Sequence, residues 1–274
     1  MRRLPLVLSA ALAIAGCAAP LPTQTVALGA TRIAYLQTGG GPPLAVFQSG
    51  LGDGKDVWAA VIRRVVPDVA VFAYDRPGYG DSSAAPAAAT APPRDPCTIA
   101  HELHLALQVA GQRPPYILVG HSIGGLYQYA FARLYPAEVA AVLLVDPTHP
   151  DHWVRMQREA PAAARIAGGM RMAAFSPVMR AEFDAQALTG CAVELDARPP
   201  PILPVRLLVR SSFGLAETGA FESLVRRLEK GWPGLLPGTT RRQVEGAGHY
   251  IQKDRPDVVA DELLALARAV PRRP

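Results

Sequence analysis

Residues 116–136 constrain the fold of this 274-residue chain more than any other segment. They read YILVGHSIGGLYQYAFARLYP, in which five residues of strand character lead into G-H-S-I-G and then into a helical pattern. A serine between two glycines at a strand-to-helix corner is typical of a nucleophile elbow, because glycines leave space where side chains would collide. The pattern predicts that Ser122 has a strained backbone and that its hydroxyl lies beyond the end of a sheet.

The rest of the chain alternates strand-length apolar segments with helical patterns. Continuous apolar runs such as Ala140–Val145 suit strands that are buried on both faces, and the alternation implies crossover connections. We therefore expect an α/β fold with a mostly parallel, twisted sheet and helices on both faces. The predicted strands are 32–39, 44–50, 69–75, 116–120, 139–146, 205–210 and 241–246.

Two interruptions divide the predicted core. The segment 147–203 contains helical pieces and ends in the proline-rich stretch RPPPILP, so we expect a small helical cap inserted between core parts 31–146 and 204–274. A short tether is expected at 18–30. The stretch 84–96, AAPAAATAPPRDP, reads as a loop that proline keeps out of helix.

The first residues, MRRLPLVLSAALAIAGCAAP, combine two arginines, a short apolar run and small residues, which is typical of a secretory signal peptide. Ile14-Ala15-Gly16-Cys17 resembles a bacterial lipobox, so residues 1–17 are interpreted as a lipoprotein signal with Cys17 as the lipidated residue. Cleavage near Ala18 or Ala19, giving a secreted protein, is the alternative. The lipobox predicts a protein of the bacterial cell envelope that is held to a membrane by its lipid.

The charge and cysteine content of the chain indicate which binding partners and which covalent links to expect. The formal net charge is +5, and removal of Arg2 and Arg3 with the leader lowers it by two. The basic residues form no stripe with interleaved aromatics, so we expect no nucleic-acid partner. Besides Cys17 the chain has only Cys97 and Cys191, an even pair that is a candidate disulfide outside the cytoplasm.

His249 is the candidate general base. It lies in EGAGHYIQKDRPDVVADEL, after the last predicted strand and just before the last helix. A glycine-flanked histidine on such a loop is suited to take a proton from Ser122 and to return it to a leaving group. A surface histidine without a role is the alternative.

The acid that orients the base has two candidates. Asp146 ends a predicted strand in LLVDPTHP and falls between Ser122 and His249 in chain order, as a triad acid should. The loop after the next strand, VRSSFGLAETGAFE, offers no aspartate, only Glu217 and Glu222. We favour Asp146 and keep Glu217 as the alternative.

Acyl transfer also requires hydrogen-bond donors for the oxyanion. The backbone N–H of Ile123, the residue after the serine, is one candidate. The second is the N–H of Leu51, because Ser49-Gly50-Leu51-Gly52 follows a strand and lets the backbone turn inward.

These motifs together resemble the α/β-hydrolase superfamily of serine esterases and lipases over about residues 30–270. FQSGLGDGKDVW is similar to the family's oxyanion segment, with Ser-Gly in place of the usual His-Gly, and AYDRPGYGDS at 73–82 is a specific family segment. The main departure is the missing aspartate after the later strand, where many members carry their acid.

The resemblance implies a carboxylesterase-like serine hydrolase that forms an acyl-enzyme, with a small-molecule ester as substrate and without a metal or organic cofactor. We expect a monomer. A nucleophilic serine argues against dehalogenase or epoxide hydrolase chemistry, which needs a carboxylate there. Amidase, thioesterase and haloperoxidase chemistry on the same triad remain alternatives, as does a lipid-anchored binding protein on an inactive hydrolase fold. Apolar residues of the cap either line an acyl pocket or pack the cap onto the core: Trp153, Met156, Met170, Met172 and Phe175.

Overall fold

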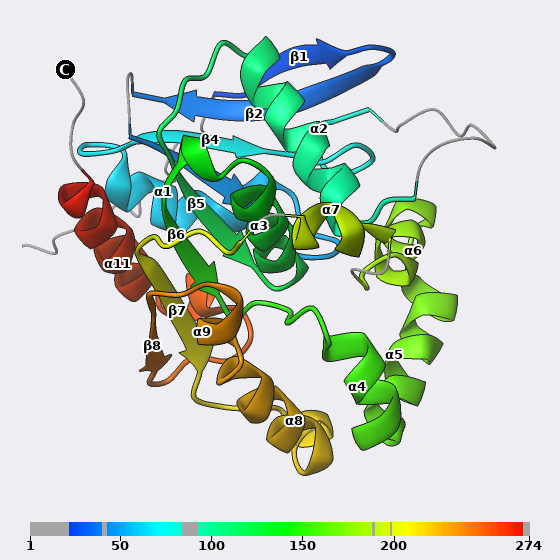
Figure 1. The fold of residues 1–274 in the computed structure, drawn as a ribbon. Helices are drawn as coiled ribbons and strands as arrows, with labels where there is room; N and C mark the ends of the chain where they lie inside the picture. Colours follow the sequence, from blue (N-terminus) through cyan, green and yellow to red (C-terminus); the bar gives the residue numbers. More distant parts are fainter. Residues whose placement is uncertain (1–21, 40–42, 84–92, 188–189, 198, 271–274) are drawn as a thin grey trace, which may run out of the picture.

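A twisted eight-stranded sheet runs through the part of the chain that the computed structural model describes, namely residues 22–39, 43–83, 93–187, 190–197 and 199–270 (Figure 1). The strand order is β1-β2-β4-β3-β5-β6-β7-β8, with β2 antiparallel to both of its neighbours and all later pairs parallel. This is the α/β-hydrolase fold, as predicted. The strands are β1 Gln24–Leu28, β2 Thr31–Thr38, β3 Leu44–Gln48, β4 Ala70–Tyr74, β5 Tyr116–His121, β6 Val139–Val145, β7 Val205–Arg210 and β8 Thr239–Val244.

Both faces of the sheet are covered by helices. Successive residues of a strand point to opposite faces. In β5, Leu118 packs with the helices α2 (Pro96–Val109), α3 (Ile123–Leu134) and α9 (Trp232–Leu235). The next residue, Val119, packs with α1 (Ala59–Val65), α10 (Ile251–Asp254) and α11 (Pro256–Ala269) on the other face. This two-sided burial explains why the central strands read as unbroken apolar runs.

The segment between β6 and β7 forms helices, as expected for a cap. They are α4 (His152–Glu159), α5 (Pro161–Ala174), α6 (Pro177–Asp184) and α7 (Ala192–Asp196). Figure 1 shows α4, α5 and α6 beyond one end of the sheet, while α7 lies close to α3. Met156 of α4 and Ala160, the residue after α4, pack with Leu224 and Leu228 of α8 (Ala220–Glu229), which comes from the second part of the core.

The expected tether at 18–30 is wrong for residues 24–28, which form β1. This strand pairs with β2 in a hairpin whose turn contains Gly29 at φ 58°. Its five residues are exposed or half-buried, with only Val26 and Leu28 packed against the core, so the segment carries little of the apolar pattern that reveals a strand.

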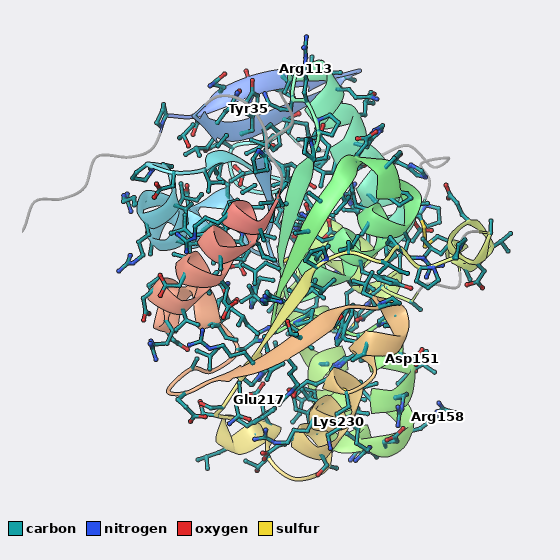
Figure 2. The ribbon with its side chains drawn as sticks, turned by 60° about the vertical axis from the view of Figure 1, so that its left-hand side comes forward. Tyr35, Arg113, Asp151, Arg158, Glu217 and Lys230 are labelled. Atoms are coloured by element: carbon teal, nitrogen blue, oxygen red, sulfur yellow. A yellow bond between two sulfur atoms is a disulfide. The ribbon has the colours of Figure 1, made fainter. Side chains whose placement is uncertain are left out.

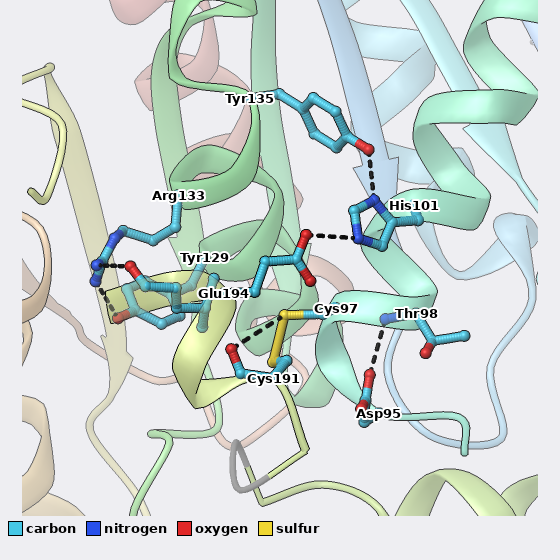
Figure 3. The surroundings of a disulfide bond; sticks show 10 residues. Asp95, Cys97, Thr98, His101, Tyr129, Arg133, Tyr135, Cys191 and Glu194 are labelled. Atoms are coloured by element: carbon cyan, nitrogen blue, oxygen red, sulfur yellow. Dashed lines mark hydrogen bonds and ion pairs between the residues drawn. A yellow bond between two sulfur atoms is a disulfide. The ribbon is translucent and has the colours of Figure 1, made fainter. Parts of the chain in front are cut away.

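Cys97 and Cys191 form a disulfide that joins α2 to the residue before α7, with a Cα–Cα distance of 5.7 Å. Figure 3 shows the bond beside a second link between the same two helices, in which His101 contacts Glu194 at 3.0 Å. The two links hold the end of the cap segment against the core. Cys17 lies outside the described residues, and lipid attachment stays a prediction. Within the described ranges, no helix has both the length and the apolar character needed to cross a membrane.

Candidate active site

Ser122 lies at the corner between β5 and α3, with φ 55° and ψ −127°. A left-handed φ is costly for a residue with a side chain. The turn also requires glycine at positions 120 and 124, because a side chain there would collide with neighbouring backbone. A Cβ on Gly120 would lie 2.6 Å from the carbonyl oxygen of Gly124, and a Cβ on Gly124 would collide with the carbonyl oxygen of Gln48. The sequence therefore folds into the elbow that its glycines predicted.

The structure brings Ser122, His249 and Asp146 into one hydrogen-bonded chain. The Oγ atom of Ser122 lies 3.1 Å from Nε2 of His249, and Nδ1 of His249 lies 2.6 Å from Oδ2 of Asp146. These three residues follow β5, β8 and β6, whose carboxyl ends meet at the same edge of the sheet. Asp146 is buried and also has a positive φ, 44°.

Burial opposes the ionisation of Asp146, but its hydrogen bond with His249 and the charges of His249 and Arg210 outweigh this effect and lower its pKa to about 2. The carboxyl group is therefore ionised at neutral pH. An ionised acceptor at Nδ1 fixes the tautomer that leaves Nε2 free to accept the serine proton.

Arg210, at the end of β7, was not singled out from the sequence. Its guanidinium donates to Asp146 at 2.7 Å and to Glu217 at 2.8 Å, and a third nitrogen lies 2.8 Å from Nδ1 of His249. A guanidinium cannot accept a hydrogen bond, so the Nδ1 proton goes to Asp146. The signal that was available is the arginine that directly follows the apolar run Leu207–Val209 at the end of the strand VRLLVR.

Glu217, the alternative acid, lies in the loop after β7. Figure 2 shows it at the same end of the molecule as α4, where Asp151 and Arg158 are labelled. Its carboxylate accepts hydrogen bonds from Arg210 and from the N–H of Gly214 at 2.9 Å. Burial opposes its ionisation, but these donors lower its pKa. Glu217 is therefore linked to the site through Arg210, whereas Asp146 contacts His249 directly.

His121, the residue before the serine, supports the loop that carries His249. Its Nε2–H donates to the backbone oxygen of His249 at 2.9 Å. Burial, helped by the charge of His249, lowers the pKa of His121 to about 3, so the ring is neutral at neutral pH.

Two cavities open beside Ser122. The first has a volume of about 380 Å³ and is lined mainly by apolar residues, including Leu51 and Ile123, the two candidate oxyanion donors. Of the apolar cap residues noted in the sequence, Trp153, Met156, Met170 and Phe175 line it, whereas Met172 is 65% exposed. The second cavity has a volume of about 160 Å³ and is the more polar of the two. Its polar wall residues include Asp146, His149, His152, Arg210, Glu217, Glu229 and His249, and apolar residues, namely Pro147, Phe221, Val225, Leu228 and Trp232, form the rest of the wall.

Among the residues that the structure describes, no group of three or more His, Cys, Asp or Glu side chains is arranged to hold a metal ion. The pair His101 and His104, which stands in a sequence slightly similar to a zinc motif, makes other contacts. His101 contacts Tyr135 and Glu194, and His104 contacts Glu138 at 3.0 Å.

The sheet, the elbow and the inserted cap together make up the α/β-hydrolase fold. The family model described as the alpha/beta hydrolase fold matches residues 43–171. The match covers less than half of the chain, and together with the structural neighbours it supports the α/β-hydrolase fold that the sequence motifs indicated.

The similar proteins are named for different reactions. The structure of a "putative epoxide hydrolase" from Pseudomonas aeruginosa superimposes with a TM-score of 0.66 at 19% identity, covering 92% of this chain and 98% of that one. A Bacillus subtilis protein, YbdG, is 31% identical over 120 residues, which is 43% of this chain and 35% of YbdG. "Putative carbamate hydrolase RutD" from Cronobacter turicensis is 35% identical over 107 residues, 39% of this chain and 38% of that protein. The chain thus spans well under half of the length of these two sequence relatives.

Proposed function

We propose that this protein is a serine hydrolase that cleaves carboxylic esters through Ser122, His249 and Asp146. The observation that carries the proposal is the continuous hydrogen-bonded chain from the Ser122 hydroxyl through the imidazole to a buried, ionised carboxylate. A serine, rather than a carboxylate, occupies the elbow, which favours acyl transfer over the epoxide chemistry named for the structural neighbour.

In the first step, Oγ of Ser122 attacks the ester carbonyl while its proton moves to Nε2 of His249. Asp146 stabilises the imidazolium that forms. The negative charge on the carbonyl oxygen is stabilised by the backbone N–H groups of Leu51 and Ile123. The C–O bond to the alcohol then breaks, and His249 returns the proton to the departing oxygen.

In the second step, water takes the place of the alcohol. His249 removes a proton from the water as its oxygen bonds to the acyl carbon, and collapse of this second intermediate releases the acid and restores Ser122. Amides and thioesters present a carbonyl to the same groups, so a substrate panel should include them.

The test replaces Ser122 with alanine. Hydrolysis of p-nitrophenyl octanoate should fall by ~10⁴-fold or more, because the remaining groups cannot form the covalent intermediate. Labelling of the wild-type protein by a fluorophosphonate should be lost in the same variant. Turnover within about tenfold of wild type, in protein with an unchanged thermal melt, would show that another nucleophile is used.

A further inference from the structure

The two cavities beside Ser122 differ in character and adjoin each other, because Thr148, His152, Glu217 and Phe221 also line both of them. This inference rests on the proposed function. The candidate oxyanion donors Leu51 and Ile123 line the apolar cavity, and His249 lines the polar one. Ser122 lines both cavities, so an ester bound to it would extend into each.

The chemistry then decides which half of the substrate enters which cavity. The carbonyl oxygen must face the backbone donors, and the acyl chain continues from the same carbon. The alcohol oxygen must lie within hydrogen-bond reach of Nε2 of His249, because that nitrogen returns the proton when the C–O bond breaks. The acyl chain therefore occupies the apolar cavity, and the alcohol occupies the polar one.

The polar cavity contains a carboxylate that is only half satisfied. Glu229, at the end of α8, is 6% exposed, and its Oε2 accepts from Arg241 at 2.7 Å. Its other oxygen, Oε1, is buried and has no hydrogen-bond partner among the described residues. A buried acceptor without a donor is costly, so this position favours a ligand that brings an O–H or N–H group.

The charges around the cavity exclude an anionic ligand. The guanidinium group in its wall, that of Arg210, already forms ion pairs with Asp146 and Glu217. Two of the three histidines in the wall are neutral at neutral pH, because burial lowers the pKa of His149 and of His152 to about 4. The groups of the cavity wall that remain available to a ligand are hydrogen-bond acceptors and carboxylates, which would repel an anion.

We propose that the polar cavity binds the leaving alcohol of the substrate as a small, uncharged polyol of the size of glycerol, esterified to an aliphatic acid whose chain lies in the apolar cavity. The smaller volume of the polar cavity, about 160 Å³ against about 380 Å³, suits a short alcohol and a longer acyl chain. One hydroxyl of the alcohol donates to Glu229.

The experiment compares esters that share an acyl group and differ in the alcohol. The kcat/KM of glycerol 1-octanoate and of propyl octanoate should differ by ~10-fold or more in favour of the glycerol ester, the effect of one hydrogen bond to a charged group. The variant Glu229→Leu should bring the ratio close to one. The matched control Glu222→Gln, two turns earlier in the same helix and outside the walls of the cavity, should preserve the ratio.

A second measurement needs no variant, which is useful because Glu229→Leu also breaks the ion pair with Arg241. Glycerol and 1-propanol at equal concentration compete with water for the acyl-enzyme of wild-type protein. The alcohol oxygen bonds to the acyl carbon as Oγ of Ser122 leaves, and His249 transfers the alcohol proton to Oγ. Glycerol should give ~10-fold more ester than 1-propanol, because the attacking alcohol binds in the same cavity as the leaving alcohol of the forward reaction.

Equal kcat/KM for the two octanoates, together with equal partitioning to the two alcohols, would overturn the polyol assignment while leaving the esterase intact. Preference for choline octanoate over the glycerol ester would overturn it as well, because the leaving group would then be cationic. Absence of Ser122-dependent turnover of every ester, p-nitrophenyl octanoate included, would instead overturn the proposed function itself.

Discussion

The cap is attached to the core by a buried ion pair whose loss should be measurable. Glu182 of α6 is fully buried and accepts hydrogen bonds from two guanidinium nitrogens of Arg76, each at 3.0 Å, and from the hydroxyl of Tyr79 at 2.8 Å. Arg94 adds a contact at 3.1 Å. Arg76 is itself 2% exposed and also donates to backbone oxygens of the oxyanion loop, so it cannot turn to solvent when its partner is removed.

Replacement of Glu182 with alanine should lower the free energy of unfolding by about 3–5 kcal/mol, because a buried guanidinium is left without its counter-charge. The effect should extend to substrate binding. Phe183 and Gln186, beside Glu182 in the cap, line the apolar cavity, so KM should rise more for an octanoate ester than for an acetate ester.

The assay is equilibrium urea unfolding at pH 7 with the disulfide intact, followed by kinetics on the two esters. Glu194→Gln is the matched control, because Glu194 is another cap glutamate but is about half exposed and pairs with His101. Exposed pairs contribute about 0–1 kcal/mol, so this variant should be nearly neutral. A loss below about 1 kcal/mol for Glu182→Ala would refute the idea that this charge cluster holds the cap.

Three further predictions concern the acid, the pH range and the disulfide. Asp146→Asn should reduce kcat/KM by up to ~10⁴-fold, whereas Glu217→Gln should cost far less; the reverse order on one short-chain ester would move the acid to the later loop. His121, with its pKa lowered to about 3 by burial, stays neutral in the folded protein while the unfolded chain takes up a proton below pH 6.5. His121 alone should therefore lower the free energy of unfolding by about 3 kcal/mol from pH 6.5 to pH 4, in addition to the effect of His149 and His152, and His121→Gln should reduce the slope by that amount in urea titrations at several pH values. Breaking the Cys97–Cys191 bond, which closes a loop of 94 residues, should cost up to about 4–5 kcal/mol in the chain-entropy model; equal urea midpoints for oxidised and reduced protein would contradict this.

The features that the sequence revealed are those that local rules determine. The G-H-S-I-G corner predicted the strained serine because its glycines are demanded by contacts within a few residues and with the adjoining strand. The central strands were visible because burial on both faces requires unbroken apolar runs. By contrast no residue of β1 is fully buried, although Val26 and Leu28 pack against the core, and its hairpin with β2 is recognisable only once the pairing is known.

The features that the sequence hid depend on where distant segments meet. Nothing in the pattern around Glu182 distinguishes it from the surface glutamates of the cap, because its buried partners Arg76 and Arg94 lie 106 and 88 residues away. The polar cavity is hidden for the same reason. His149 and Glu229 are 80 residues apart in the sequence. They line the same cavity only because the segments after β6 and β7 lie together in the fold.

The position of the proposed acid, Asp146, follows from the packing of the last strands. Parallel pairing of β6 with β7, and of β7 with β8, brings their carboxyl ends together, so a carboxylate after either β6 or β7 lies near the loop that carries His249. In this chain the end of β7 holds Arg210, a buried cation that needs a carboxylate partner. Asp146 at the end of β6 serves the guanidinium and the imidazole with the same oxygen, at 2.7 and 2.6 Å. Arg210 therefore helps to hold Asp146 ionised. Although no aspartate follows β7, Asp146 provides the carboxylate that contacts His249.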